Sequence, residues 1–274
     1  MQRARGENYS MVKNVVASNN LHTICTSGNC PNIGECWNAG TATFMILGEI
    51  CTRACKFCAT CTGRPLPPDS EEPMRLAAAV KSMHLRHCVI TSVDRDDLED
   101  GGASVWAETI KCVKRENPRT TIETLIPDFD GNQVNISKVI MAGPDVLSHN
   151  IETVRRLTPV IRTKAKYDRS LEVVRYISGS GIRAKSGFML GLGENEAEVV
   201  ETIRDLFATG CRILTIGQYL QPTREHMEVV EYITPEKFEE YRLLALETGF
   251  SFVESGPLVR SSFHAEKHVK AQEI

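Results

Sequence analysis

Six of the ten cysteines in this chain stand in two closely spaced triplets, a pattern typical of metal-binding thiolates. The first triplet has the spacing C-x4-C-x5-C, and the second has C-x3-C-x2-C. Their members are Cys25, Cys30 and Cys36, followed by Cys51, Cys55 and Cys58. Three thiolates hold three irons of a four-iron cluster, so the fourth iron stays open for a small molecule. The two triplets therefore predict an enzyme with two iron–sulfur clusters, and the second triplet predicts an open iron.

The position of Cys61 leaves two other interpretations open. Cys61 extends the second triplet by another C-x2-C step. As a fourth ligand it would close the cluster and restrict it to electron transfer, as in ferredoxins, whose order C-x2-C-x2-C-x3-C differs from the order here. A zinc site would normally take four ligands from paired C-x2-C spacings. The spacing thus favours an open cluster over a closed cluster or a zinc-stabilised binding protein.

Composition narrows the class of protein. The chain has 274 residues, of which 42% are hydrophobic and 24% charged, so it has enough apolar side chains for a full core. A net charge of −3 argues against nucleic acid as a partner. Residues 1–14 are polar, and no apolar run is long enough to span a bilayer, so we expect neither a secretory signal nor a membrane partner. The expected location is the reducing cytoplasm, where clustered cysteines bind metal more often than they form disulfides. The isolated residues Cys88, Cys112 and Cys211 are expected in the core.

Short apolar runs alternate with longer amphipathic ones along the chain. The predicted strands cover residues 43–49, 88–93, 120–127, 146–149, 184–191 and 213–219. The predicted helices between and after them cover residues 71–85, 104–116, 132–142, 168–178, 196–209 and 235–249. Strands that alternate with helices indicate βαβ units and a parallel sheet. The predicted fold class is α/β, a partial (β/α)6 barrel of the TIM type, with a doubly wound sheet as the alternative.

Two segments lie outside this alternation. Residues 1–42 are predicted to form an irregular N-terminal extension that carries the first triplet. Residues 43–234 form the barrel, and residues 235–274 form a C-terminal helix and tail. We therefore expect one catalytic domain with a cluster-binding extension at each end.

The second triplet directly follows the first predicted strand, and barrel enzymes place their chemistry in loops at the carboxyl ends of strands. In this position the C-x3-C-x2-C motif resembles the motif of the radical S-adenosylmethionine superfamily. The resemblance implies that the open iron binds the amino and carboxylate groups of S-adenosylmethionine. One electron from the cluster then cleaves this molecule to a 5′-deoxyadenosyl radical. The protein has to bind the cofactor, orient it and exclude water.

Several segments at strand ends fit the superfamily's site for S-adenosylmethionine. Phe57 would cover the cluster or the adenine, and Asn150 or Glu152 would bind the ribose hydroxyls. The other candidates are Ser92 and Asp94 after the second strand, and Gly191 and Glu194 in GLGE after the fifth. Each polar residue could instead cap a helix, and GLGE could be a turn before the next helix.

The two triplets and six further motifs together resemble the lipoyl synthase family. The triplets lie in NLHTIC (20–25), CPNIGECW (30–37) and CTRACKFC (51–58). The further motifs are TSVDRDDLEDGGA (91–103), HNIET (149–153), GFMLGLGEN (187–195), GQYLQPT (217–223), EYITPEKF (231–238) and GPLVRSSF (256–263). They follow one another in order over most of the chain.

The resemblance implies an enzyme that inserts two sulfur atoms, at carbons 6 and 8 of an octanoyl chain on a lysine of a carrier domain. The sulfur comes from an auxiliary 4Fe-4S cluster, held by the first triplet and a serine of the Arg260–Ser262 motif. We expect Ser262 as this ligand, with Ser261 as the alternative. A hard alkoxide matches iron–sulfur chemistry less well than a thiolate, so it is easily released when the cluster gives up sulfur.

The resemblance also implies partners. The expected substrates are octanoylated lipoyl domains of 2-oxoacid dehydrogenase acyltransferase subunits and the glycine cleavage H protein. The expected electron donor is ferredoxin or flavodoxin, and an iron–sulfur carrier would supply clusters. Biotin-type sulfur insertion or methylthiolation of RNA would be the alternative radical chemistries. A methylthiolating enzyme would be expected to add a nucleic-acid module, and the chain has no basic appendage of that kind.

Overall fold

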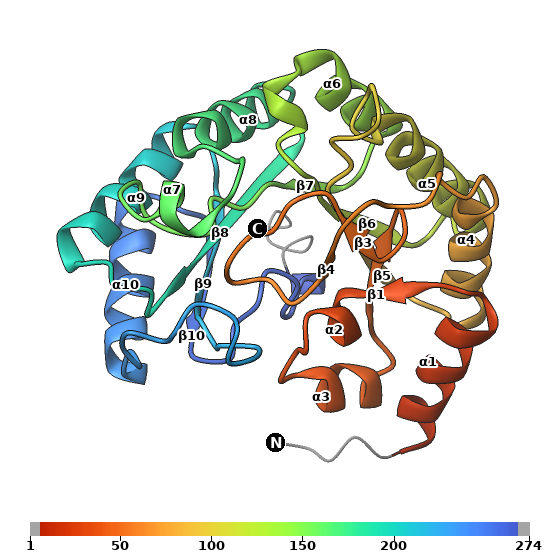
Figure 1. The fold of residues 1–274 in the computed structure, drawn as a ribbon, viewed down its shortest axis with the longest axis horizontal. Helices are drawn as coiled ribbons and strands as arrows, with labels where there is room; N and C mark the ends of the chain where they lie inside the picture. The colour runs from red at the N-terminus through yellow and green to blue at the C-terminus, as the bar shows by residue number, and fades with distance from the viewer. Residues whose placement is uncertain (1–5, 268–274) are drawn as a thin grey trace. The chain divides into compact units, whose positions relative to one another are not determined.

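The computed structural model describes residues 6–267, drawn as a coloured ribbon in Figure 1. The chain divides into two compact units. Of the described residues, the first unit contains 6–53, Ala59–Phe129 and Val134–Asp145. The second contains Ala54–Cys58, Asp130–Gln133 and 146–267. The outermost parts of the two predicted extensions, residues 1–5 and 268–274, lie outside the described residues.

The first unit contains a sheet with the strand order β1-β2-β5-β6. These strands are β1 (His22–Thr23), β2 (Thr43–Ile46), β5 (His87–Ser92) and β6 (Thr121–Leu125). β1 pairs antiparallel to β2, and the other pairs are parallel. All four residues of β2 are buried, which agrees with the near-continuous apolar runs expected of parallel strands.

Among the helices of the first unit, α4 and α5 lie side by side (Figure 1). The helices of this unit are α1 (Glu7–Ser18), α2 (Ile24–Ser27), α3 (Ile33–Asn38), α4 (Glu72–Ser82), α5 (Ala103–Glu116) and α6 (Gln133–Ala142) without its first residue. A short 3-10 turn, η1 (Phe129–Gly131), has Phe129 in the first unit and its other two residues in the second. Asp100 starts α5 by accepting the amide hydrogens of Gly102 at 3.0 Å and Ser104 at 2.8 Å. The buried face of α5 includes Trp106 and Ile110.

A separate two-stranded ribbon in the first unit joins β3 (Ile50–Cys51) and β4 (Cys61–Thr62). The two strands run parallel, with Ile50 opposite Cys61 and Cys51 opposite Thr62. The sequence did not predict this ribbon, because two-residue strands carry no periodic signal.

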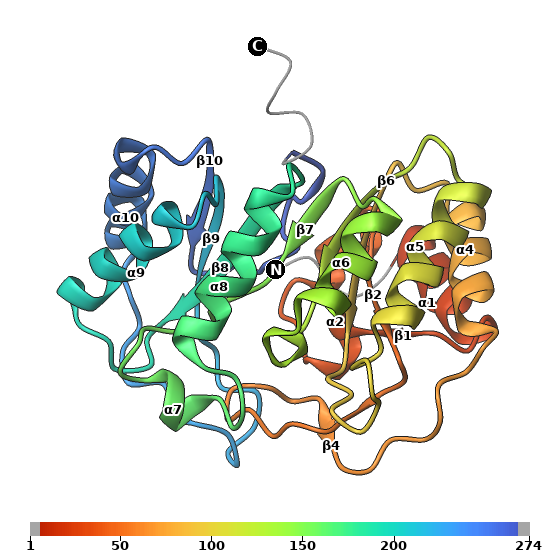
Figure 2. The same cartoon turned by 90° about the horizontal axis from the view of Figure 1, so that it is seen from above.

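The second unit contains four parallel strands in chain order, β7 (Val146–Ser148), β8 (Arg183–Leu190), β9 (Ile213–Gln218) and β10 (Phe252–Gly256). Its helices are α7 (Thr158–Ile161), α8 (Tyr167–Gly179), α9 (Glu196–Ala208) and α10 (Pro235–Thr248). Figure 2 shows α9 and α10 on one side of β9 and β10. Asn195 and Glu198 form a capping box at the start of α9. Thr234 accepts the Lys237 amide hydrogen at the start of α10.

The structure confirms the predicted alternation of strands and helices. Each of the six predicted strands and six predicted helices is present, with ends shifted by a few residues at most. Within each unit the parallel strands follow chain order without reversal, as in a βα barrel, whereas a doubly wound sheet reverses direction. The prediction of an irregular N-terminal extension was wrong for residues 6–42, which contain α1, α2 and α3. None of the helices within residues 6–267 is long and apolar enough to cross a membrane.

Candidate active site

In each unit, the residues that could carry chemistry follow the carboxyl ends of parallel strands. In the first unit, Asp94 follows β5 and Asp128 follows β6. In the second unit, Asn150 and Glu152 follow β7, and Gly191 follows β8. Parallel α/β enzymes bind their ligands at this edge of the sheet, so the strand ends are the expected place for the site.

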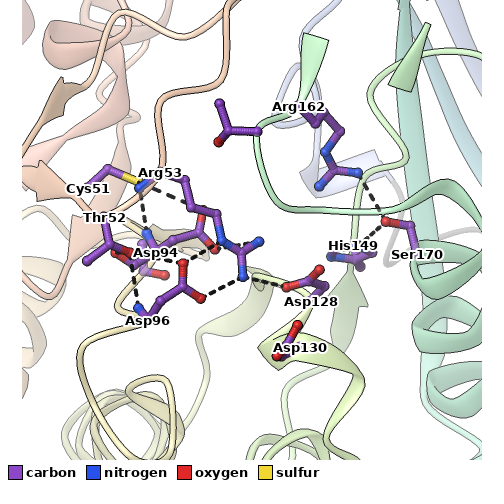
Figure 3. Close-up of polar contacts among 12 residues, drawn as sticks. Cys51, Thr52, Arg53, Asp94, Asp96, Asp128, Asp130, His149, Arg162 and Ser170 are labelled. Atoms are coloured by element: carbon purple, nitrogen blue, oxygen red, sulfur yellow. Dashed lines mark hydrogen bonds and ion pairs between the residues drawn. The ribbon is translucent and has the colours of Figure 1, made fainter. Parts of the chain in front are cut away.

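The sulfur of Cys51 accepts two main-chain hydrogen bonds (Figure 3). The amide of Arg53 donates to Sγ at 3.4 Å, and the amide of Asp94 donates to it at 3.3 Å. A carboxylate oxygen of Asp94 lies 3.8 Å from the same sulfur. Amide hydrogen bonds to a ligating sulfur stabilise the thiolate and tune the cluster's reduction potential. The surroundings of Cys51 therefore suit a cluster ligand.

The ribbon geometry separates Cys61 from Cys51. Successive side chains of a strand point to opposite faces. Cys61 lies opposite Ile50, so its side chain shares a face with Ile50, and the side chain of Cys51 points to the other face. Cys61 is exposed, whereas Cys51 is buried. This arrangement favours the open cluster over a cluster closed by Cys61.

Cys55 and Cys58 lie in the second unit, in a short segment that hydrogen bonds hold on both sides. The amide of Lys56 donates to the carbonyl of Ile161 at 2.9 Å, and the carbonyl of Lys56 accepts the amide hydrogen of Met227 at 3.1 Å. Within the segment, the amide of Cys58 donates to the carbonyl of Cys55 at 3.0 Å. Both cysteines are partly exposed.

Phe57 anchors this cysteine segment. Its ring packs on a buried apolar cluster of the second unit, formed by Val154, Leu157, Ile161, Leu192 and Tyr219. Next to it, a ring nitrogen of His226 lies 3.0 Å from the carbonyl oxygen of Cys58. Phe57 is only partly buried, and its predicted contact with the cluster or the adenine stays a prediction.

Asn150 carries a buried polar atom that no described residue satisfies. Its Oδ1 has no hydrogen-bond partner within the described part of the chain. A Cβ atom at Gly187 would lie 3.3 Å from this oxygen and 2.2 Å from Oγ1 of Thr215. The backbone of β8 can approach Asn150 and Thr215 this closely only because Gly187 lacks a side chain. An unsatisfied buried amide oxygen indicates a missing donor, and a ribose hydroxyl would supply one.

Glu152 has a left-handed backbone with φ 68°, which is uncommon for a residue other than glycine. Its amide donates to the carbonyl of Gly187 at 3.1 Å, and its carbonyl accepts the amide hydrogen of Met189 at 2.9 Å. These two bonds to β8 hold the unusual conformation. The predicted contact of the Glu152 carboxylate with ribose stays a prediction.

A buried group of polar side chains supports the loop that carries Asn150 (Figure 3). Nη1 of Arg162 donates to the carbonyls of Asn150 at 3.4 Å and Ile151 at 3.3 Å, and to Oγ of Ser170 at 3.0 Å. A ring nitrogen of His149 lies 2.9 Å from the same hydroxyl. The sequence analysis did not identify Arg162 or Ser170, because a buried arginine and serine on separate elements form no local motif.

Gly191 and Glu194 form a turn. Both carboxylate oxygens of Glu194 accept amide hydrogens, one from Gly191 and one from Leu192 at 2.9 Å. Gly191 has φ 96°, and a Cβ atom there would lie 2.2 Å from Nε2 of Gln218. The GLGE segment therefore forms a turn before the next helix, as the alternative interpretation expected. A direct contact of Gly191 or Glu194 with S-adenosylmethionine stays a prediction.

Ser92 and the three isolated cysteines have structural surroundings. Oγ of Ser92 accepts a hydrogen bond from the indole nitrogen of Trp106 at 3.2 Å, so this hydroxyl is already engaged with α5. Cys88, Cys112 and Cys211 are buried, as predicted. Burial raises the pKa of Cys88 and of Cys211 to about 12, so these two thiols stay protonated and act as core residues.

The first triplet lies on and between α2 and α3. Cys25 is buried on α2, Cys30 follows this helix, and Cys36 lies on α3. The amide of Cys30 donates to the carbonyl of Cys25 at 3.0 Å. Burial raises the pKa of Cys25, and the nearby Cys30 adds to the increase, against hydrogen bonds from Thr43 and Trp37. Cys25 is therefore protonated in the free chain and must release its proton when it binds a metal.

The Arg260–Ser262 motif follows β10 and is held by the second unit. The buried ammonium of Lys185 donates to the main-chain carbonyl of Ser261. Nη1 of Arg260 donates to the carbonyl of Gln218 at 3.2 Å. A Cβ atom at Gly217 would lie 2.2 Å from the carbonyl oxygen of Val259, so the segment lies directly against β9. Lys185 is a further residue that sequence reasoning missed.

The residues present fit iron–sulfur clusters and a polar organic ligand. Among residues 6–267, no three His, Cys, Asp or Glu side chains are arranged around one point as a single metal ion requires. A four-iron cluster takes each thiolate on a different iron, so its cysteines need no common point. The buried oxygen of Asn150 provides an acceptor for a ligand hydroxyl.

The superfamily of the chain follows from a family comparison. The family described as Radical SAM superfamily matches residues 45–206. Solved structures with a similar fold include a methylornithine synthase, with a TM-score of 0.52 and 13% identity over 91% of this chain and 79% of that one. A peptide-bound SuiB from Streptococcus suis has a TM-score of 0.59 and 10% identity over 86% of this chain and 54% of that one. The chain therefore is a radical S-adenosylmethionine enzyme.

Relatives of nearly full length define the family within this class. A lipoyl synthase from Phocaeicola vulgatus is 61% identical, over 96% of this chain and 92% of the relative. One from Flavobacterium psychrophilum is 58% identical, over 96% and 91%. A mitochondrial lipoyl synthase from Nematostella vectensis is 57% identical, over 96% and 91%. The chain belongs to the lipoyl synthase family, and its cofactors are S-adenosylmethionine and two 4Fe-4S clusters.

Proposed function

We propose that this enzyme inserts two sulfur atoms, at carbons 6 and 8 of a protein-bound octanoyl-lysine, with a division of work between its two cysteine triplets. Cys51, Cys55 and Cys58 hold the cluster that binds S-adenosylmethionine. Cys25, Cys30, Cys36 and Ser262 hold the auxiliary cluster that supplies sulfur. The observation that carries the function is the similarity to lipoyl synthases over 96% of the chain.

The surroundings of Cys51 support the assignment of the second triplet. Its sulfur accepts amide hydrogens from Arg53 and Asp94, and Cys61 lies on the other face of the ribbon. When bound, the cluster and S-adenosylmethionine supply the 5′-deoxyadenosyl radical that removes a hydrogen atom from the octanoyl chain. The protein's part is to keep one iron free of protein ligands and to hold the cofactor in a fixed orientation.

Several side chains orient S-adenosylmethionine in this proposal. Asn150 accepts a ribose hydroxyl through its unsatisfied oxygen, and Glu152 accepts a second one. Gly187 lets β8 pass close to Asn150 and Thr215, which a side chain at this position would prevent. The remaining proposed contacts are Phe57, Ser92, Asp94, Gly191 and Glu194.

Ser262 would be the most weakly bound ligand of the auxiliary cluster in this proposal. A serine alkoxide would be a hard ligand on a soft iron–sulfur cluster, and protonation would turn it into a neutral hydroxyl that binds iron poorly. Lys185 holds the carbonyl of the preceding residue, so the serine can leave the iron while the main chain stays in place. Ser261 is the alternative ligand.

The finer partners and the domain division belong to the same proposal. The substrates are octanoylated domains of 2-oxoacid dehydrogenase acyltransferase subunits and the glycine cleavage H protein. Ferredoxin or flavodoxin donates electrons, an iron–sulfur carrier delivers clusters, and the enzyme works in the cytoplasm. Residues 1–42 and 235–274 serve as cluster-binding extensions of the barrel formed by residues 43–234.

An anaerobic assay tests the function. The chain is reconstituted with iron and sulfide, then given dithionite, S-adenosylmethionine and an octanoyl-lysyl peptide, and both products are followed by mass spectrometry. A peptide with two added sulfur atoms, together with 5′-deoxyadenosine, is the expected result. Deoxyadenosine without sulfur in the peptide would contradict the assignment of the auxiliary cluster. An iron-loaded protein that forms neither product would contradict the radical mechanism.

A further inference from the structure

Arg53 stands between the first two cysteines of the C-x3-C-x2-C motif, and its side chain is buried among three carboxylates (Figure 3). The guanidinium binds Asp96 with two parallel hydrogen bonds, each 2.8 Å long. It also donates to Asp128 at 2.8 Å and lies 3.3 Å from a carboxylate oxygen of Asp94. The Arg53 side chain is 4% exposed, and that of Asp128 is completely buried. A buried arginine with this many charged partners restrains the surrounding loops much more strongly than an exposed surface ion pair does.

The main chain around Arg53 is held as firmly as its side chain. The Arg53 amide donates to Sγ of Cys51, and its carbonyl accepts a hydrogen bond from the hydroxyl of Thr62 at 3.2 Å. The amide of Thr52 donates to the carbonyl of Asp94 at 3.1 Å, and the hydroxyl of Thr52 accepts the amide hydrogen of Asp96 at 3.0 Å. The loop after β3 is therefore attached to the loop after β5 through both backbone and side chains.

The charges make the guanidinium difficult to replace. Burial acts to lower the pKa of Arg53, but the hydrogen bonds that it donates to Asp96 and the charges of Asp94 and Asp128 outweigh this effect and raise the pKa. The guanidinium therefore stays charged. A lysine ammonium keeps the charge but lacks the planar fork that binds Asp96 twice and still reaches Asp128.

We propose that Arg53 is a positioning residue that holds Cys51 in ligand-ready geometry before any cluster is bound. The three carboxylates come from the ends of β5 and β6, so they tie the cysteine loop to the sheet edge at which the chemistry takes place. The sulfur of Cys51 then meets its two amide donors in the free protein, and assembly of the cluster requires no ordering of this loop. This inference rests on the proposed role of Cys51 as a ligand.

Hydrogen exchange of the cluster-free chain tests the proposal. In the Arg53→Lys variant, we expect the amides of Thr52, Arg53, Asp94 and Asp96 to exchange about tenfold faster or more, because each bond to a charged group contributes strongly to local order. Asp96→Asn removes the paired contact from the other side, so it should accelerate the same amides. This second variant keeps the test valid if one substitution prevents folding.

Arg95 provides a matched control. It is equally buried, in the same loop, and binds Asp97 with two hydrogen bonds of 2.8 Å. Its other donors reach the carbonyls of Leu47 and Leu66, not the segment around Arg53. Arg95→Lys should therefore leave the four amides near wild-type exchange, even where it lowers the melting temperature. Equal acceleration in Arg95→Lys, or unchanged exchange in Arg53→Lys, would overturn the proposal.

A spectroscopic readout separates this proposal from the ligand assignment. In the reconstituted wild-type enzyme, addition of S-adenosylmethionine should change the electron paramagnetic resonance signal of the reduced cluster. Arg53→Lys should lose this cluster to a chelator faster than the wild type does. A wild-type signal that does not change when S-adenosylmethionine is added would contradict the role of the second triplet. The hydrogen-exchange result would still show whether Arg53 orders the loop. Equal chelator loss in both proteins would count against the positioning role.

Discussion

The buried ammonium of Lys185 in β8 contacts the main-chain carbonyl of Ser261, the residue directly before the proposed cluster ligand Ser262. The two residues lie 76 positions apart in the chain. The contact joins the C-terminal motif to the interior of the second unit. It holds the main chain next to Ser262 in place, so that only the serine side chain has to move when its hydroxyl binds or leaves an iron.

Removal of the Lys185 ammonium should impair sulfur insertion selectively. In Lys185→Met, the carbonyl of Ser261 loses a charged donor, which typically costs about 1.5–3 kcal/mol, so we expect roughly a tenfold or larger loss of sulfur insertion. Formation of 5′-deoxyadenosine, measured by mass spectrometry, should fall much less. Lys237→Met is the control, since Lys237 forms ion pairs on the surface of the same unit. Equal loss of both products in Lys185→Met would contradict the expected selectivity.

Ser262 and Cys55 should behave differently when each is changed to alanine. Ser262→Ala should abolish sulfur insertion and leave cleavage of S-adenosylmethionine largely intact, because the serine belongs to the auxiliary cluster. Cys55→Ala should abolish both, because the radical cannot form without its cluster. Iron content and both products are measured in parallel, with Ser261→Ala as the neighbouring control. Normal product from Ser262→Ala would show that another residue is the ligand, and loss of sulfur insertion in Ser261→Ala instead would identify Ser261.

Cys61 should be dispensable for the radical cluster. Its side chain is exposed and shares a ribbon face with Ile50, away from Cys51. We expect Cys61→Ala to bind iron and cleave S-adenosylmethionine within about twofold of the wild type, as surface substitutions usually do. Iron analysis and deoxyadenosine formation provide the measurement. A variant that fails to assemble this cluster would favour the closed-cluster interpretation.

Asp100 should make the fold sensitive to acid. Burial acts to raise its pKa, but hydrogen bonds from Ser104, Lys138 and Gly102 lower it to about 2. Because the pKa of the folded state lies below the unfolded value of 3.8, the stabilisation is complete above about pH 4 and is lost as the pH falls toward 2. With allowance for solvent screening, it contributes about 1–2 kcal/mol at neutral pH.

The matched variant for this prediction is Asp100→Asn. Its melting temperature at pH 7 should be several degrees below that of the wild type, and the difference should shrink as the pH is lowered through the acidic range. Thermal unfolding followed by circular dichroism at several pH values gives both curves. A difference that does not depend on pH would mean that the Asp100 charge adds nothing to the cap of α5.

The local patterns of the chain were sufficient for much of the fold. Strands such as β5 and β9 are short apolar runs, and helices such as α5 and α9 carry apolar residues at helical spacing, so each element is encoded within its own segment. The short elements α2, β3 and β4 escaped prediction. A few residues carry no period, and tertiary contacts rather than propensity stabilise them.

The spacing of six cysteines and the order of the surrounding motifs were enough to predict the chemistry, because both can be read without knowing the fold. The sequence alone did not reveal which side chains support those cysteines. Arg53 meets Asp128 across 75 positions of the chain, and the face on which Cys61 lies depends on its register with Ile50. The partners of Arg53 and the orientation of Cys61 became known from the folded structure, since contacts between distant residues depend on which strands become neighbours and in what register.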